Sequence, residues 1–590
     1  MAATIEDLAQ EWLRLDQDPT TRQEIETLLS QPSSKDELEL RLRKRIAFGT
    51  AGLRGAMTAG FSRMNSLTVI QASQGLAAYV LSQEPRAREM GIVIGRDARY
   101  NSEKFAKMAA AAFLAKGIKV LWLDLVHTPL VPFAVDRMGA AAGVMVTASH
   151  NPANDNGYKV YWSNGCQIIP PHDAGIARAI EQNLEPVTWD TSVVTDANPL
   201  VIDALELVVK DYYAAVTEKA VIPKNPQASP IPFVYTPMHG VGLPFFKTAV
   251  EAVLNGDLTA LHVVEAQAHP DPAFPTVRFP NPEEHGALDL AMETADKQGI
   301  QLVFANDPDA DRFSAAEKVD GKWRQFTGNQ LGMLFASVFH ELYEGPKACL
   351  ASTVSTRMLA RMAEKEGMHF EETLTGFKWM GNVGRKLQKQ GYTSIFAFEE
   401  AIGYMFSNVV FDKDGIAAAA MFLAACHVWR TKGLTPWGKL QQLYEKYGYF
   451  EDANTYLRSP SAETTNQVFE SIRARKPTHV GSRRILQWRD LLTGYDSSTP
   501  DHKPLLPVDK TAQMITCVLE RDVVFTVRGS GTEPKIKLYI EGSVVPESGE
   551  QKQQAAVYPV MAKEAAKQVC EDLVREWFRP EETGLRLAGS

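Results

Sequence analysis

Residues 142–152 read AGVMVTASHNP, a short apolar run followed by a polar tail that ends in proline. An apolar run of this length, bounded by a turn signal, predicts a buried strand of a parallel sheet at 142–146. In open α/β sheets ligands bind beyond the carboxyl ends of the strands, which is where Ser149 and His150 fall. Ser149 is therefore a candidate nucleophile on a rigid strand end, although a Ser-His pair in a loop is by itself more often a solvated turn.

Strands and helices alternate on both sides of this stretch, and the layout recurs twice further along the chain. The expected helices of the first round are 38–47, 67–82 and 103–116, and its other strands are 91–95 and 119–123. The later rounds contribute strands at 232–235, 301–305, 348–353 and 394–398. Strands that alternate with helices at this spacing indicate βαβ units and parallel sheets.

The pattern changes after about residue 449. Short adjacent strands are expected at 514–520, 523–528 and 536–541, followed by an amphipathic helix at 551–577. A chain of 590 residues is too long for one core, and ordinary domain sizes suggest about four domains. We therefore predict an α/β protein with three consecutive mixed α/β domains, 1–205, 206–327 and 328–450, and a C-terminal α+β domain at 451–590.

Composition excludes several classes of protein. The chain is 45% hydrophobic and 23% charged, and its formal net charge of -9 argues against a nucleic-acid partner. Its five cysteines are scattered without a CxxC pair, which indicates reduced thiols. The acidic N-terminus lacks the features of a signal peptide, and the apolar stretch 415–426 is shorter than the roughly 20 residues that a membrane span needs. We expect a cytoplasmic protein with no membrane partner.

Asp307, Asp309 and Asp311 stand at alternate positions after the predicted strand 301–305. In an extended loop alternate side chains point the same way, so the three carboxylates can converge on one Mg²⁺ or Ca²⁺ ion. An EF-hand is excluded because Arg312 and Lys318 occupy the positions that need Gly and Glu. The alternative, an acidic surface turn, is disfavoured because three close like charges repel unless something neutralises them. Mg²⁺ leaves coordination positions open for phosphate oxygens, which favours phosphoryl transfer.

The segment 528–535 reads RGSGTEPK and lies between two predicted strands. Its glycines, the hydroxyls of Ser530 and Thr532, and the cations Arg528, Lys535 and Lys537 can form a phosphate cradle. The same segment can also be a glycine-rich hairpin turn, and the two interpretations are compatible.

Other strand ends are less specific. Glu399 and Glu400 close an apolar strand, where carboxylates are costly unless they face a polar ligand such as a sugar hydroxyl. The loop 373–378 supplies hydroxyls and a cation, and 48–55 (FGTAGLRG) supplies three glycines that allow close approach of backbone to a ligand. Asp97 and Arg99 follow another strand, where pairing with each other is favoured over ligand contact.

Together these parts describe one reaction. A serine hydroxyl can carry a phosphoryl group as a covalent intermediate, and a cation at the three aspartates offsets the charge of the transferring group. A distal cradle holds a second phosphate, and the two glutamates hold the sugar between them. Such an enzyme would move phosphate from one end of a sugar to the other.

Four loops, 147–152, 307–312, 399–404 and 528–534, resemble the phosphoserine, metal, sugar and phosphate loops of the α-D-phosphohexomutase superfamily. They occur in the family's order, and the resemblance covers nearly the whole chain. It implies four domains around a deep central cleft. It also implies transfer from phosphoserine to a sugar monophosphate, reorientation of the bisphosphate, and return of the other phosphate.

The resemblance implies roles for individual residues. Ser149 carries the phosphate and, with Asp307, Asp309 and Asp311, holds one Mg²⁺ per chain. Arg54, His150 and Lys159 surround the transfer, with His150 or Lys159 as the proton shuttle. The implied substrate-binding residues are Glu399, Glu400, Gly376, Lys378, Arg312, Arg528, Ser530, Gly531, Thr532 and Lys537. A sugar 1,6- or 1,5-bisphosphate is the implied activator, sugar phosphates are the partners, and a monomer or weak dimer is expected.

Segments 48–54, 155–162, 371–382, 396–405 and 491–496 are similar to the eukaryotic phosphoglucomutase-2 (phosphopentomutase) branch. Its members interconvert ribose or deoxyribose 1-phosphate with the 5-phosphate, and often less well glucose 1-phosphate with the 6-phosphate. The superfamily's sugar loop commonly reads Gly-Glu-x-Ser-Gly-His, whereas this chain has Ile402 at the Ser and Tyr404 at the His. A lost hydroxyl bond costs about 1–3 kcal/mol, so we expect a pentose to be preferred.

Three alternatives stay open from the sequence. A glucose 1,6-bisphosphate synthase would use the same four loops. A phosphatase would hydrolyse the phosphoserine unless closure of the cleft excludes water, with the domain after residue 449 as the moving part. A non-catalytic sugar-phosphate binder is disfavoured because Ser149 and all three aspartates are present.

Overall fold

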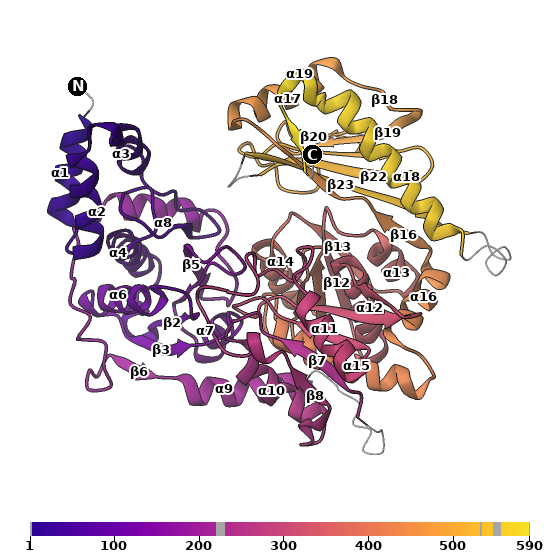
Figure 1. Cartoon of the computed structure of the whole chain (residues 1–590), viewed down its shortest axis with the longest axis horizontal. Helices are drawn as coiled ribbons and strands as arrows, with labels where there is room; N and C mark the ends of the chain where they lie inside the picture. The colour runs from indigo at the N-terminus through magenta and orange to yellow at the C-terminus, as the bar shows by residue number, and fades with distance from the viewer. Residues whose placement is uncertain (1–2, 220–229, 531–533, 547–555, 589–590) are drawn as a thin grey trace. The chain divides into compact units, whose positions relative to one another are not determined.

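The computed structural model describes residues 3–219, 230–530, 534–546 and 556–588 (Figure 1). The chain forms two compact units. The first comprises Met1–Lys347 and Gly376–Pro436, and the second comprises Ala348–Thr375 and Trp437–Ser590. The unit borders at 347 and 375 fall inside the segment 328–450 that the sequence analysis assigns to one domain.

The first sheet of unit 1 has six strands in the order β1-β5-β4-β2-β3-β6. Strands β2, β3, β4 and β6 are parallel, and β5 and β1 are added antiparallel at one edge. The bounds are β1 Leu53–Ala56, β2 Ile92–Arg96, β3 Val120–Leu125, β4 Ala142–Val146, β5 Asp155–Trp162 and β6 Val201–Asp203. The predicted strand at 142–146 is thus confirmed as β4, and all five of its residues are buried.

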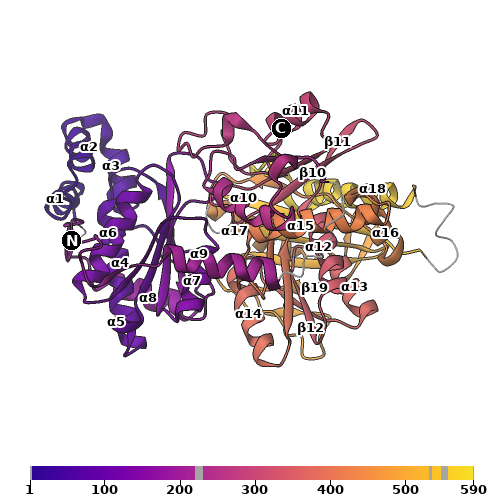
Figure 2. The same ribbon diagram turned by 90° about the horizontal axis from the view of Figure 1, so that it is seen from below.

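Helices cover both faces of this sheet (Figure 2). Helices α4 (Ser66–Gln83) and α6 (Ser102–Ala115) share a hydrophobic core with one face, which includes Ile92 and Ile94 of β2. Helix α7 (Leu130–Met138) covers the other face. There Gly95 and Gly143 leave room for its valines, since a Cβ at Gly95 would lie 2.7 Å from Val131. Burial of both faces explains why β2 and β4 read as apolar runs.

The N-terminal helices α1 (Ile5–Leu15), α2 (Pro19–Ser30) and α3 (Lys35–Leu42) form a small core of their own around Trp12 and Phe61. The predicted helix 38–47 is wrong at its end, because α3 stops at Leu42. Beyond it the chain pairs with another segment: the Ile46 amide donates to the Phe61 carbonyl at 2.7 Å, and the Arg45 guanidinium lies over the Phe61 ring. The helix therefore ends earlier than its charge pattern predicts, because this contact with a distant segment holds residues 45 and 46 outside the helix.

The second sheet of unit 1 has the order β11-β10-β9-β7-β8. Strands β7 (Phe233–Thr236), β8 (Leu261–Val263) and β9 (Leu302–Ala305) are parallel, as predicted for βαβ units. Strands β10 (Ser314–Val319) and β11 (Lys322–Gln325) follow antiparallel. Helices α10 (Gly242–Val253) and α11 (Asp289–Gln298) accompany this sheet, and the metal-loop candidate 306–313 joins β9 to β10.

The third α/β segment contributes to both units. In unit 1 the antiparallel strands β14 (Ser394–Glu399) and β15 (Gly403–Phe406) accompany α12 (Gly328–Leu342), α14 (Phe377–Lys389) and α15 (Gly415–Thr431). In unit 2 the parallel strands β12 (Lys347–Ser352) and β13 (His369–Thr373) flank α13 (Met358–Glu366). No helix in the described part of the chain is long and apolar enough to cross a membrane.

The C-terminal part of unit 2 is the expected α+β fold. Its antiparallel sheet includes β17 (Thr455–Arg458), β19 (Arg483–Asp490), β21 (Met514–Leu519), β22 (Val523–Gly529) and β23 (Lys535–Val544). Helices α17 (Ala462–Arg475) and α18 (Tyr558–Leu573) share its hydrophobic core through Phe469 and Val569. The predicted strands at 514–520, 523–528 and 536–541 correspond to β21, β22 and β23.

Candidate active site

Ser149 lies in the loop that follows β4, and it is only 3% exposed. Its φ is +53°, a left-handed conformation that costs a non-glycine residue about 1–2 kcal/mol. The loop holds this conformation in part through Thr147, whose hydroxyl accepts from the Ser149 amide at 2.9 Å. The Ser149 hydroxyl lies 2.9 Å from Oδ2 of Asp307 and 3.2 Å from Nδ1 of His150. The strand end thus presents a buried hydroxyl to an acid and an imidazole.

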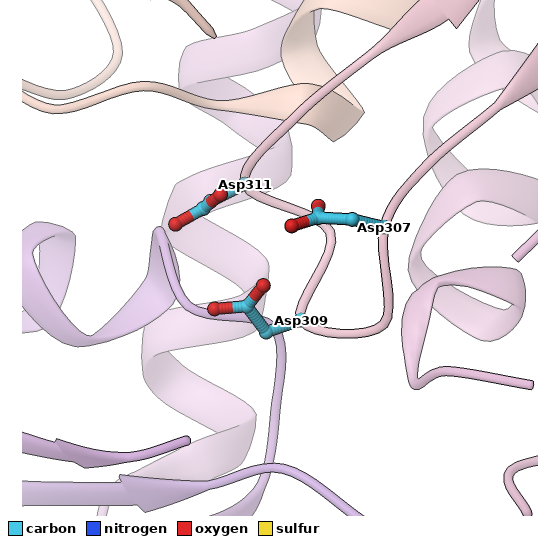
Figure 3. A group of neighbouring side chains, drawn as sticks. All are labelled: Asp307, Asp309 and Asp311. Atoms are coloured by element: carbon cyan, nitrogen blue, oxygen red, sulfur yellow. The ribbon is translucent and has the colours of Figure 1, made fainter. Parts of the chain in front are cut away.

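The three aspartates of the β9–β10 loop point toward one another (Figure 3). All three side chains are fully buried, and one carboxylate oxygen from each lies within 4.8 Å of the others. Burial and the neighbouring carboxylates raise the pKa of Asp307 well above its usual range. Oδ1 of Asp309 and Oδ1 of Asp311 have no hydrogen-bond partner among the residues that the structure describes. The three carboxylates are buried, they offer only oxygen ligands, and two of their oxygens lack a hydrogen-bond donor among the described residues. Such a set of ligands fits a hard divalent cation.

Two lysines neutralise part of the aspartate charge. Nζ of Lys159, on β5, lies 2.8 Å from Oδ2 of Asp309 and 2.9 Å from Oδ2 of Asp311. Nζ of Lys413 lies 2.8 Å from Oδ2 of Asp311. Burial alone would lower the pKa of Lys413, but the carboxylates of Asp311 and Asp412 outweigh it and raise that pKa. The Lys413 amine is therefore held as an ammonium donor to the loop 306–313, which we call the acidic loop.

Lys413 and Thr128 contact the aspartates but were not among the predicted site residues. Lys413 lies in the charged segment DKDG at 412–415, where the apolar helix α15 begins. This abrupt change from charged to apolar residues could have indicated a functional residue. Thr128 donates its hydroxyl to Oδ2 of Asp309 at 2.6 Å and its amide to the Asp309 carbonyl at 2.9 Å. These two bonds orient one carboxylate of the acidic loop from the loop after β3.

Two arginines lie near Asp307, Asn151 and His150, next to the Ser149 hydroxyl's own partners. Nε of Arg312 is 3.9 Å from Oδ2 of Asp307 and has no hydrogen-bond partner among the described residues. Arg54, on β1, donates to the side-chain oxygen of Asn151 at 3.2 Å. Burial, followed by the charges of Arg312 and Arg54, lowers the pKa of His150 well below its usual value. The imidazole beside Ser149 is therefore neutral at physiological pH.

The glycine-rich loop 48–55 approaches β5 closely. Gly52 has a φ of +73°, and a Cβ there would lie 1.8 Å from the Tyr158 carbonyl oxygen, so only glycine fits. Nζ of Lys378 donates to the Thr50 hydroxyl at 2.5 Å. The structure thus brings Lys378, from the unit 1 part of the predicted loop 373–378, into contact with Thr50 of the predicted loop 48–55.

The predicted sugar loop follows β14. Oε2 of Glu399 accepts from the Gly376 amide at 3.2 Å, which connects the carboxylate pair to the loop before α14. Glu400 is partly exposed, whereas Ile402 is 1% exposed and Tyr404 is completely buried beside Phe335. The polar side chains that this loop presents toward solvent are therefore its glutamates, and neither Ile402 nor Tyr404 offers a hydroxyl there.

The predicted phosphate cradle belongs to unit 2. Arg528 is the last residue but one of β22. It donates to the Thr375 hydroxyl and has a buried Nε without a hydrogen-bond partner among the described residues. Lys537 lies opposite Arg528 in the antiparallel β22–β23 register, so the two side chains share one face. The Ser530 amide donates to the Lys535 carbonyl at 2.8 Å, while Gly531 and Thr532 lie outside the described residues.

A buried serine, an acidic cluster suited to a divalent cation and a set of arginines form a site suited to phosphoryl transfer. Residues 45–186, 210–321 and 327–447 match the alpha/beta/alpha domains I, II and III of the phosphoglucomutase/phosphomannomutase family. The chain belongs to this family, which is a family of enzymes.

Three relatives are similar over nearly their whole length. Phosphoribomutase of Saccharomyces cerevisiae is 47% identical, over 97% of this chain and 96% of its own. Phosphopentomutase of Homo sapiens is 42% identical, over 98% of this chain and 96% of its own. Human glucose 1,6-bisphosphate synthase is 40% identical, over 98% of this chain and 94% of its own.

Among solved structures, parafusin, a phosphoglucomutase from Paramecium in its open form, superposes with a TM-score of 0.64. It is 17% identical over 89% of this chain and 95% of its own. A phosphoglucomutase/phosphomannomutase family protein from Burkholderia thailandensis superposes with a TM-score of 0.63. It is 17% identical over 93% of this chain and 99% of its own. At this identity the likeness concerns the fold, which agrees with the predicted α/β domains and their C-terminal companion.

Proposed function

We propose that this enzyme is a phosphosugar mutase that moves phosphate between C1 and the terminal carbon of a sugar. Its substrates are ribose or deoxyribose 1-phosphate and 5-phosphate, and secondarily glucose 1-phosphate and 6-phosphate. The observation that carries the proposal is the Ser149 hydroxyl, 2.9 Å from Asp307 in a buried carboxylate triad with unsatisfied oxygens. The four-domain division at 205, 327 and 450 and a cytoplasmic location belong to the same proposal.

The reaction transfers one phosphoryl group at a time. The bond between phosphorus and Oγ of phosphorylated Ser149 breaks while a bond forms to a hydroxyl oxygen of the sugar monophosphate, and the proton of that hydroxyl passes to the freed Oγ. The bisphosphate then reorients; Oγ attacks its other phosphate, the bond from that phosphorus to the sugar oxygen breaks, and the serine proton passes to the sugar oxygen. His150 Nδ1, 3.2 Å from Oγ, is placed to take the serine proton in that return step. Lys159, whose amine already donates to two carboxylates, is the weaker candidate for a base.

Mg²⁺ is the cation we propose for Asp307, Asp309 and Asp311, with Ser149 as a further ligand. When bound there, it would stabilise the charge of the transferring phosphoryl group. Arg312, whose Nε has no hydrogen-bond partner among the described residues, and Arg54, which donates to Asn151, are placed to bind the phosphate. A sugar 1,6- or 1,5-bisphosphate would load Ser149 at the start of the cycle.

Sugar preference follows from the loop after β14. Because Ile402 and Tyr404 are buried, the loop offers carboxylate acceptors and no hydroxyl or imidazole donor at these two positions. The relatives named for pentoses are 42–47% identical to this chain. We therefore propose that a pentose phosphate is preferred.

A substrate panel tests this preference. We expect a higher kcat/KM for ribose 1-phosphate than for glucose 1-phosphate, by about 5- to 160-fold if the lost bond is worth about 1–3 kcal/mol. The assay compares ribose, deoxyribose, glucose and mannose 1-phosphates, with and without added glucose 1,6-bisphosphate. A higher kcat/KM for glucose 1-phosphate would contradict the pentose preference.

The same assays, with products identified, distinguish a mutase from a bisphosphate synthase and from a phosphatase. A bisphosphate synthase would form glucose 1,6-bisphosphate from glucose 1-phosphate and 1,3-bisphosphoglycerate faster than it isomerises sugars. The relative with that name is the less similar one, at 40% identity. A phosphatase would release inorganic phosphate in step with turnover. Neither result is expected.

Arg528→Ala should weaken binding of the substrate's non-reacting phosphate. We expect KM to rise by about 10–100-fold, since a charge-assisted bond contributes about 1.5–3 kcal/mol, while kcat changes less. Arg484→Ala is the matched control, because Arg484 is an exposed arginine of the same sheet that pairs with Glu520. An unchanged KM in Arg528→Ala would remove this residue from the phosphate cradle.

A further inference from the structure

Arg99 joins the end of β2 to the loop that carries Ser149. Its Nη2 donates to the carbonyl oxygens of Ser149 and Asn151, both at 2.6 Å. Its Nη1 donates to the carbonyls of Pro152 at 2.9 Å and Asp155 at 3.3 Å. One guanidinium therefore binds four carbonyl groups between residues 149 and 155. We call these contacts the Arg99 clamp.

The guanidinium is itself held from other sides. Oδ2 of Asp97 lies 3.3 Å from its Nε, and Oδ1 of Asp97 accepts from the Arg99 amide and the Ser102 hydroxyl. One face of the guanidinium lies over the ring of Phe274, 4.9 Å from its centroid. The pairing of Asp97 with Arg99 was predicted from the sequence. The clamp on residues 149–155, which we call the serine loop, was not. Because the planar fork is fixed on several sides, it can define the position of the loop.

The serine loop needs such a partner. Ser149 has left-handed backbone geometry, and its own carbonyl is one of the two closest acceptors of Arg99. Buried carbonyl groups require hydrogen-bond donors, and the carbonyls of Ser149, Asn151 and Pro152 lie in the turn between β4 and β5, outside the β4–β5 ladder. The Arg99 side chain is 1% exposed, and in the part of the chain that the structure describes all hydrogen bonds of its guanidinium go to main-chain carbonyls.

We infer that Arg99 is a positioning residue for phosphoryl transfer: by clamping four carbonyls it holds Oγ of Ser149 against the acidic loop. The inference rests on the proposed mutase function for its kinetic consequence, but the clamp itself can be measured without it. Asp97 has a supporting role, because it orients the guanidinium from the opposite side.

Arg99→Lys is the sharpest test. Lysine keeps a positive charge beside Asp97 but replaces the rigid fork with a single ammonium, so the four carbonyls cannot all be bound in the same geometry. We expect kcat to fall by about 10²-fold, the effect of misplacing a reacting atom by about 1 Å. KM for the sugar phosphate should stay within about threefold, because substrate binding is not touched. Amide hydrogen exchange of residues 149–155 should become faster, with little change in the rest of unit 1.

Arg96→Lys is the matched control. Arg96 is the last residue of β2, three residues before Arg99, and its Nε donates to Asp124 at 2.6 Å. It has no hydrogen bond to residues 149–155 in the part of the chain that the structure describes. We expect wild-type kcat and wild-type exchange of the serine loop in this variant.

Asp97→Asn gives a second route if Arg99→Lys fails to fold. Asparagine keeps an acceptor for the Ser102 hydroxyl but removes the charge that orients the guanidinium. We expect the same pattern as in Arg99→Lys with a smaller amplitude.

The outcomes are distinguishable. Wild-type kcat together with wild-type loop exchange in the folded variants would overturn the inference, as would a raised KM at unchanged kcat. A wild-type enzyme that isomerises none of the sugar phosphates in the panel would refute the proposed function, and exchange of residues 149–155 would still decide whether Arg99 holds the loop.

Discussion

Ser149→Ala should reduce mutase turnover by at least about 10⁴-fold, in line with the loss of a covalent nucleophile. The hydroxyl is the atom that carries the phosphoryl group, and no other serine or threonine hydroxyl is hydrogen-bonded to Asp307 in the described part of the chain. The variant should fold, because alanine adopts the same left-handed backbone at similar cost. The Oγ bonds to Asp307 and His150 contribute only about 1 kcal/mol each.

Two measurements check this result. Turnover of ribose 1-phosphate gives the loss of activity, and intact-protein mass after incubation with glucose 1,6-bisphosphate gives the phosphorylation. The wild type should gain one phosphoryl group and the variant none. Ser163→Ala, at an exposed serine just after β5, should behave as wild type in both. Phosphorylation of Ser149→Ala, or turnover near that of the wild type, would assign the nucleophile to another residue.

Asp307→Asn should separate stability from activity. Asparagine can still accept from the Arg312 amide and can donate to the Ser149 hydroxyl, so both hydrogen bonds of the native side chain have replacements. Without divalent cations the variant should be at least as stable as the wild type, because one of three mutually repelling buried carboxylates is gone. Its turnover should fall by about 10²–10⁴-fold, since a bound metal contributes several kcal/mol to such a transition state.

Thermal unfolding with and without Mg²⁺ provides a test that does not depend on turnover. Mg²⁺ at 100 times its Kd should stabilise the wild type by about 2.7 kcal/mol and the variant by far less. Asp296→Asn is the control, because Asp296 is an exposed aspartate that pairs with Lys318 away from the acidic loop. A variant that keeps the full Mg²⁺ stabilisation would show that the ion binds elsewhere.

Local sequence patterns predicted most of the fold because strands and turns are determined largely by nearby residues. The run 142–146 and the alternating aspartates 307–311 became the strand and the convergent acidic loop that their periodicity predicts. The helix expected to reach residue 47 ends at Leu42 instead, because Ile46 pairs with Phe61. That error came from a tertiary contact, which helical periodicity does not report.

The predicted site residues fall into separate groups. Ser149, His150, Lys159, Arg312 and the three aspartates lie close together in unit 1, whereas Arg528 and Lys537 belong to unit 2. Lys413 was missed because it lies about 100 residues from the aspartate that it contacts, and a lone lysine before a helix has no distinctive spacing. A contact between two residues this far apart in the chain depends on tertiary packing, which local sequence patterns do not reveal.

The sequence by itself determined the chemistry of each strand end: a serine, an acidic triad, a glutamate pair and a basic glycine-rich hairpin, in the order typical of the family. Tertiary structure alone decided which of these groups touch, as when Ser149 meets Asp307 or Lys159 meets Asp309 and Asp311. It also decided the role of Arg99, whose partners on the serine loop are carbonyl groups. Every residue carries a carbonyl, so no pattern of side chains could have identified these acceptors.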